Sequence, residues 1–280
     1  MTGRPLVALL MLAATSAAYG QTWRSVDVSR QLRDSSDHRI RVRYVAGKFT
    51  MRPTSDPVLF SMQLRYDEDR TEPLHRYDPD TRRLTLGLET QSVRLARHTN
   101  DGDFGEMWLA LSNAVPLDLE LELGATQSRI DAGGLMLNNL RVQTGASDAT
   151  LDFSAPNRAR MRRLDVQLGA AGFVIRNLGN ANVANIHVEG GVGSIELDFG
   201  SSVRSDVDVE ANVALGKLTL RMPRDVGVRV EVRKLLASFD HPGLDKRGNA
   251  FYSDNWDSAE VRVRVRAETV FGAIDIDRNR

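Results

Sequence analysis

The stretches VEGGVGSIEL (188–197) and VALGKLTL (213–220) share one pattern: alternating apolar residues, a small-residue break, and a second short alternating run. Related stretches recur every 21 to 24 residues from about Leu117 to the C-terminus. Alternation with a period of two is typical of a β-strand with one buried face. Recurrence at this spacing is typical of a solenoid, in which one strand-containing unit is stacked on the next.

Two sets of positions define the repeat. The apolar strand centres are Leu121, Val142, Val166, Val188, Val209 and Val230, and the small or turn-compatible breaks are Thr126, Ser147, Ala171, Gly193, Gly216, Ala237 and Gly272. A centre precedes its break by five residues in the first four copies and by seven afterwards, which predicts a two-residue bulge that enters once and persists. The sequence therefore predicts an all-β fold, a single-stranded β-solenoid built as a β-helix-like stack of rungs of about 21–24 residues.

The chain divides into three predicted parts. Residues 1–20 form a cleaved signal peptide, residues 21–115 an N-terminal β region of degenerate rungs and loops continuous with the solenoid, and residues 116–280 the regular rungs with a capping insertion at 240–259. In the N-terminal region, 39–51 resembles a first rung, and 58–66 and 83–89 alternate like strands. We expect an exposed hairpin loop at 67–80 and another polar loop at 97–105.

The first 20 residues have the layout of a bacterial Sec-type signal peptide. Arg4 precedes an apolar run at 6–14, and Ala18 and Gly20 occupy the −3 and −1 positions of a cut before Gln21. An uncleaved anchor fits poorly, because this run is too short to cross ~30 Å of hydrocarbon. No second hydrophobic segment follows, so we expect an exported chain without membrane insertion, either periplasmic or extracellular.

The composition excludes several classes of function. With 37 basic and 37 acidic residues the chain has no net charge for attracting nucleic acid or anionic lipid. The absence of cysteine excludes disulfides, thiolate metal sites and a cysteine nucleophile.

Signatures of catalysis are also missing. The five histidines lack metal-binding spacing, and neither a nucleophile elbow nor a P-loop is present. We therefore predict no catalytic residue, no cofactor and no enzyme. A polysaccharide-active β-helix enzyme is the alternative, and it would need acidic and basic residues gathered at one spot.

In a parallel in-register stack, residues one repeat apart lie about 4.8 Å from each other. One predicted outward column largely alternates in charge, as a stabilising surface ladder would: Glu120, Arg141, Asp165, His187, Asp208, Arg229. A neighbouring column contains Glu189, Glu210 and Glu231, followed by Arg266. Three adjacent carboxylates are a candidate calcium site. A solvated acidic stripe is the simpler interpretation, because side chains on a flat face seldom converge.

The insertion before the last strand contains Phe251, Tyr252 and Trp256, together with His241. These aromatic residues are candidate ligand contacts, for example a platform for sugar. The alternative is that the insertion covers the open end of the stack, since terminal repeats need such protection.

The phrases LELELGA (119–125), VQLGAAG (166–172), VEGGVGSIEL and VALGKLTL, with the closing segment at 243–277, resemble the bacterial toast-rack family, including LiaF-like C-terminal domains and putative-adhesin β-solenoids. The resemblance covers about residues 40–278. It implies a single-domain solenoid at the cell envelope with no established activity and no catalytic residues.

Two non-enzymatic functions remain open. The first is an adhesin-like module that binds an envelope glycan or protein through a solenoid face, and it predicts an accessible aromatic patch. The second is an envelope scaffold or stress-response accessory that works through protein contacts or self-association, and it predicts an uncovered terminal rung or a flat apolar face.

Overall fold

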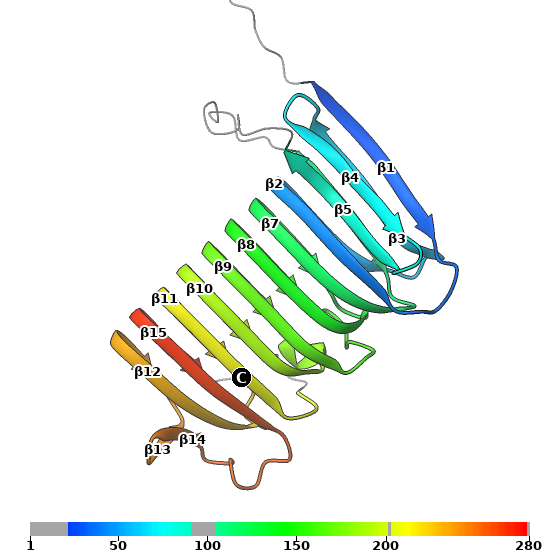
Figure 1. Ribbon diagram of the computed structural model, residues 1–280. Helices are drawn as coiled ribbons and strands as arrows, with labels where there is room; N and C mark the ends of the chain where they lie inside the picture. Colours follow the sequence, from blue (N-terminus) through cyan, green and yellow to red (C-terminus); the bar gives the residue numbers. More distant parts are fainter. Residues whose placement is uncertain (1–21, 91–104, 201–202, 279–280) are drawn as a thin grey trace, which may run out of the picture.

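The computed structural model describes residues 22–90, 105–200 and 203–278. Within these ranges the chain is built from β-strands, and its one helical element is a short 3₁₀ turn, η2 (Leu178–Ala181). The long strands lie side by side along a single axis (Figure 1). The predicted all-β solenoid is confirmed. The predicted signal peptide lies outside the described residues.

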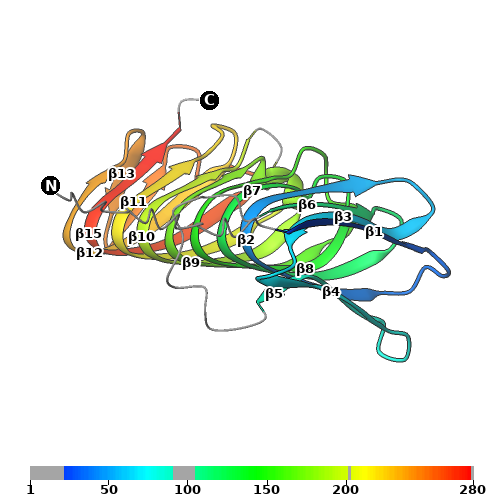
Figure 2. The same cartoon turned by 90° about the horizontal axis from the view of Figure 1, so that it is seen from above.

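Eight long strands each form one rung, and every neighbouring pair is parallel. In spatial order they are β2 (His38–Thr54), β7 (Pro116–Asp131), β8 (Met136–Asp152), β9 (Met161–Arg176), β10 (Val183–Asp198), β11 (Val207–Arg221), β15 (Arg262–Asp277) and β12 (Gly227–Asp240). Each strand bends near its middle. Its first arm and its second arm therefore lie in two layers, as the view from above shows (Figure 2).

The predicted breaks lie in register at this bend, which we call the corner. Val188 of β10 pairs with Ala211 of β11, not with Val209, and both Val188 and Ala211 precede their corner glycine by five residues. The separation is constant, so the predicted two-residue bulge was wrong. The small Ala211 at a strand centre concealed the true repeat, because the larger Val209 nearby is also buried.

The last rungs do not follow the order of the sequence. β15 lies between β11 and β12, so β12 forms the terminal rung. Gly216 and Gly272 have φ angles of 143° and 131°. A Cβ on Gly272 would lie 1.7 Å from the carbonyl oxygen of Gly216. If β12 lay beside β11 instead, Ala237 would occupy the position of Gly272, and its Cβ would collide in the same way. β15 has glycine at this position and therefore fits against β11.

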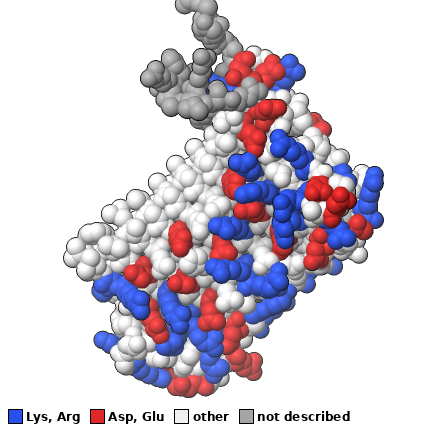
Figure 3. Space-filling view, in the orientation of Figure 1, with Lys and Arg blue, Asp and Glu red and all other residues white. Residues whose placement is uncertain are grey.

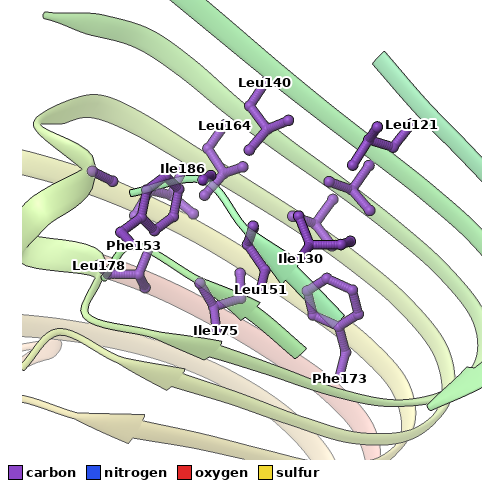
Figure 4. Packing of buried hydrophobic residues seen from close by; sticks show 14 of the residues in the cluster. Leu121, Ile130, Leu140, Leu151, Phe153, Leu164, Phe173, Ile175, Leu178 and Ile186 are labelled. Carbon is purple, nitrogen blue, oxygen red and sulfur yellow. The ribbon is translucent and has the colours of Figure 1, made fainter. Parts of the chain in front are cut away.

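The core lies between the two arms. Figure 4 shows Leu140, Leu164 and Ile186 of the first arms facing Leu151 and Ile175 of the second arms. All five side chains are buried. Alternation along each strand places the remaining residues outside, so the amphipathic pattern of the sequence becomes an apolar interior with a polar surface.

Short strands extend both layers at the N-terminal end. On the second-arm side β6 (Glu106–Ser112) pairs with β2, and the antiparallel strands β3 (Val58–Asp67) and β1 (Trp23–Gln31) follow. On the first-arm side β5 (Arg83–Thr90) pairs with β2, and β4 (Thr71–Asp78) pairs with β5.

The expected hairpin loop at 67–80 was therefore wrong in part, because most of it forms β4. Pro73 lies in β4, which among the described strands pairs with β5 alone, and an edge strand tolerates proline. The predicted loop at 97–105 lies outside the described residues, apart from Gly105.

At the other end, β13 (Leu244–Arg247) and β14 (Ala250–Ser253) form a hairpin. β14 pairs with β12 only at Arg229 and Val230. Phe251 packs edge-on against Phe239, with the ring centroids 4.9 Å apart. The insertion thus covers the first arm and the interior of the last rung. Among the described residues, no strand pairs with the outer edge of the second arm of β12.

Candidate functional site

One outer face of the stack carries a ladder of alternating charge. In strand register the column reads Arg41, Glu120, Arg141, Asp165, His187, Glu210, Arg266 and Glu231. The nitrogen–oxygen distances include 3.4 Å between Arg41 and Glu120 and 3.8 Å between Arg266 and Glu231. Figure 3 shows the mixed charge spread over this face, which we call the charged face. The predicted ladder is present, but its last two members differ from the prediction.

The candidate acidic column is not a column. Glu189 pairs with Asn212, whereas Glu210 lies between His187 and Arg266. The insertion of β15 places Arg266 between Glu210 and Glu231. The predicted calcium site assumed an unbroken acidic stack, and that assumption was wrong. No group of three acidic or histidine residues that could hold a metal occurs within the described ranges.

A polar pocket of about 470 Å³ opens on the charged face near the C-terminal end of the stack. Its charged lining comprises the five arginines Arg162, Arg163, Arg229, Arg264 and Arg266 and the two acids Asp208 and Glu210, with His187 beside them. We call it the arginine pocket. Three further acids, Asp165, Asp206 and Glu231, pair with Arg163, Arg264 and Arg229, so the pocket gathers five guanidinium groups whose charge is largely balanced by carboxylates around it.

The arginines of the pocket are engaged to different extents. Arg229 donates from Nε to the Tyr252 hydroxyl at 3.0 Å and also contacts Glu231. The hydrogen bond to Tyr252 raises the pKa of Arg229. Arg264 contacts Asp206 and Asp208 at 2.8 and 3.5 Å. By contrast, the side chain of Arg266 is 78% exposed and lies 3.8 Å from the Glu231 carboxylate. Arg162 is also exposed.

A second hollow runs along the corner, perpendicular to the strands, with a volume of about 1040 Å³. Its floor contains Gly124, Gly145, Gly169 and Gly191, one from each successive rung, and its polar wall contains Gln143, Gln167, Glu189 and Asn212. We call it the corner groove. A Cβ on Gly124, Gly169 or Gly191 would lie 2.0, 2.7 or 2.6 Å from a carbonyl oxygen of the preceding rung, so glycine lets the rungs approach here and leaves the floor without side chains.

Large apolar side chains are exposed at the C-terminal half of the same corner. They are Val192, Leu215, Val270, Phe271, Leu235 and Leu236, with exposed fractions between 38% and 72%. We call them the corner ridge. In Figure 3 the corresponding edge of the molecule lacks charged residues. Trp108 on β6 is the one other large apolar residue exposed to this degree in the described parts of the chain.

The three candidate ligand-contact aromatics lie on or beside the terminal hairpin. Each is partly buried. Tyr252 and Trp256 form an edge-on pair with centroids 5.5 Å apart. Arg247 and Arg262 lie 5.5 and 5.7 Å from the Tyr252 and Trp256 rings. Phe251 is packed on Phe239. These rings contact the protein's own arginines and core, an arrangement that favours a cap over a sugar platform.

A comparison with known protein families agrees with this fold. The sequence profile described as the N-terminal domain of toast_rack, DUF2154, matches residues 20–175, more than half of the chain. The chain belongs to the toast-rack family. No curated protein matches this toast-rack chain. Among its described residues, no helix has the length and apolar character needed to cross a bilayer.

The chain is also similar to solved structures. A putative cell adhesion protein from Clostridium sporogenes gives a TM-score of 0.51 at 14% identity, over 92% of this chain and 100% of that chain. A putative adhesin from Bacteroides fragilis gives 0.43 at 11% identity, over 92% and 98%. At these identities the first similarity shows the fold.

Sequence reasoning missed both the arginine pocket and the corner ridge. The pocket joins Arg162 of β9 to residues of β15, which the sequence order places six strands later. The ridge brings β12 and β15 into contact in inverted order. The pairs Leu235–Leu236 and Val270–Phe271, directly before Ala237 and Gly272, were visible as breaks in the alternation, and they were the available signal.

Proposed function

We propose that this toast-rack protein is a non-catalytic, adhesin-like binding module of the cell envelope or cell exterior, and that it binds an anionic glycan through the arginine pocket. The observation that carries the proposal is the gathering of five arginines in the lining of one pocket, where Arg162 and Arg266 are exposed. The similarity to the putative cell adhesion protein from Clostridium sporogenes supports a binding role.

The chemistry of the pocket favours a carboxylate- or phosphate-bearing polymer. Guanidinium groups bind such anions through paired, charge-assisted hydrogen bonds. Arg162 and Arg266 are the best placed to do so, because both are exposed and Arg266 lies 3.8 Å from Glu231. The other arginines contact an acid or Tyr252 at 3.0 Å or less. Asn139 and Asn185 also line the pocket, and their amide groups can bind sugar hydroxyls.

The test compares binding to a polyuronate, such as polygalacturonate, with binding to a neutral glucan, such as dextran, by affinity electrophoresis and calorimetry. We expect binding to the polyuronate alone, weakening as salt is raised. The double variant R162A/R266A should bind about tenfold or more weakly, the loss expected for charged hydrogen bonds.

Arg129→Ala is the matched control. Arg129 is exposed on the second arm, where it lies in register with Thr50 and Thr150, so its loss removes one arginine charge, half of that removed by the double variant, at a distance from the pocket. Equal binding by the control and the double variant would show that the pocket is not the site. Equal binding of the polyuronate and dextran would contradict an anionic ligand.

A scaffold role rests on a different surface, the apolar corner. The uncovered second arm of β12 and the corner ridge are the features that the scaffold hypothesis predicts.

A further inference from the structure

The corner ridge and the floor of the corner groove belong to the same two columns of residues. Along the stack, each rung places two adjacent residues at the corner, directly before its break residue. In β7, β8 and β9 these pairs are Gly124–Ala125, Gly145–Ala146 and Gly169–Ala170. In β11, β15 and β12 they are Ala214–Leu215, Val270–Phe271 and Leu235–Leu236.

The corner therefore changes from small to bulky side chains along the axis. The rung between the two halves is β10, with Gly191 and Val192. The three rungs directly before β10 are small and the three rungs after it are bulky, while β2, the first rung, has Val45 and Ala46 at the corner. A surface of this kind is complementary to itself when one copy is reversed, because the bulky half of each copy then faces the hollow half of the other.

We propose that two copies of this chain form an antiparallel dimer through the corner, with the two-fold axis passing beside Val192. In this arrangement β12, β15 and β11 of one copy lie against β7, β8 and β9 of the other. Leu235 and Leu236 face Gly124 and Ala125, while Val270 and Phe271 face Gly145 and Ala146. Burying these apolar side chains supplies the driving force.

The flanking charges are compatible with this pairing. The arrangement places the exposed Arg233 of one copy opposite the acidic Glu122 of the other. The uncharged Gln143 lies opposite Glu268, and Gln167 opposite Asn212. One unfavourable contact remains at the axis, where the two Glu189 carboxylates approach each other.

The size of the contact sets the expected strength. Seven rungs span about 29 Å along the axis, and the columns between the flanking polar residues span about 16 Å along the strands. Two such surfaces amount to roughly 900 Å² of contact, near the lower limit for a specific interface. The dimer is therefore concentration-dependent, and monomer and dimer exchange.

The oligomeric state can be measured by sedimentation velocity over a concentration series. We expect a monomer–dimer equilibrium, with the dissociation constant raised at least tenfold, about the effect of one interface hot spot, by Leu215→Ser with Phe271→Ser. Ala146→Arg, on the small half of the corner, should weaken the dimer equally, because its long side chain would fill the hollow. Glu189→Gln should tighten the dimer by removing the like-charge contact.

Cysteine trapping tests the geometry independently, since the natural chain contains no cysteine. Val192→Cys should oxidise to a disulfide-linked dimer, and so should Ala146→Cys combined with Phe271→Cys. Arg129→Cys, exposed on the second arm, is the control and should not. All substituted residues are exposed, and a circular dichroism melt verifies that each variant folds.

Three results would overturn the proposal. A monomer at the highest attainable concentration would do so, as would a dimer that is insensitive to the corner variants. The third is a monomer whose corner ridge instead mediates binding to phosphatidylcholine vesicles in a flotation assay. The polyuronate test does not depend on any of these outcomes, because R162A/R266A leaves the corner unchanged.

Discussion

Replacing Gly216 with alanine tests whether the corner glycines hold the rungs together. Gly216 has a φ of 143°, in a region that other residues avoid. A Cβ built on it would lie 1.8 Å from the carbonyl oxygen of Gly193 in the neighbouring rung. Ordinary contacts of this type exceed about 3 Å, so the backbone of one rung would have to move away from the other.

The expected cost follows from these two effects. A strained backbone costs about 1–3 kcal/mol, and a displaced rung loses part of its packing and ladder, so we expect a total of about 3–5 kcal/mol. For a chain of this size, that loss corresponds to a fall of roughly 6–20 °C in melting temperature. Hydrogen exchange should show that β11 and β15 lose protection before β7 and β8, because a solenoid is stabilised by contacts between neighbouring rungs.

Gly248→Ala is the matched control. Gly248 also has a positive φ, of 63°, but no atom lies within 4 Å of the position of its Cβ. Its replacement should cost about 1–2 kcal/mol, the strain alone. If the two variants melted at the same temperature, close approach between rungs would not be the reason for glycine at the corner, and our explanation for the position of β15 would fail with it.

Three further predictions concern the core, a buried amide and an acidic group. Val188→Asp places a carboxylate in a fully buried position without a partner, so it should lower the melting temperature sharply, whereas an unchanged melt would contradict the strand register. Asn157 is buried, and its side chain makes three hydrogen bonds to backbone groups of neighbouring segments. Asn157→Ala should therefore lower the free energy of unfolding, measured in urea, by about 2–4 kcal/mol, and Asn185→Ala, at an exposed position, should lower it much less. Burial tends to raise the pKa of Asp206, but hydrogen bonds from the Arg262 amide and the Arg264 side chain hold it below its ordinary value of 3.8. The Asp206 carboxylate therefore stabilises the fold above its unfolded-state pKa, and this stabilisation is lost as the pH falls through its folded-state pKa. Asp206→Asn should make the melting temperature depend less on pH at the acidic end, and an unchanged dependence would exclude this role.

Much of the architecture could be predicted from short-range patterns. The alternation along 213–220 and the recurrence of small residues at Ser147, Ala171 and Gly193 predicted strands, corners and stacking correctly. The misplaced register at Val209 arose because Val209 and Ala211 both face the core, and alternation alone cannot tell which one is aligned with Val188.

The candidate site was less predictable, since it depends on which rung lies next to which. The acidic stack of Glu189, Glu210 and Glu231 assumed that neighbours in sequence are neighbours in space. The arginine pocket and the corner ridge both depend on β15 entering the stack ahead of β12.

The amino-acid sequence by itself determined that the chain is a β-solenoid with glycine at several of its corners, because strand alternation and backbone φ are properties of a few consecutive residues. Only the tertiary structure decided the order of the last rungs, and with it the charges and apolar side chains that meet on the surface. That order depends on the contact of Gly272 with the Gly216 carbonyl, more than 50 residues away. A contact of this kind has no signature in either local sequence, because glycine at a corner is compatible with several neighbours until the rungs are packed.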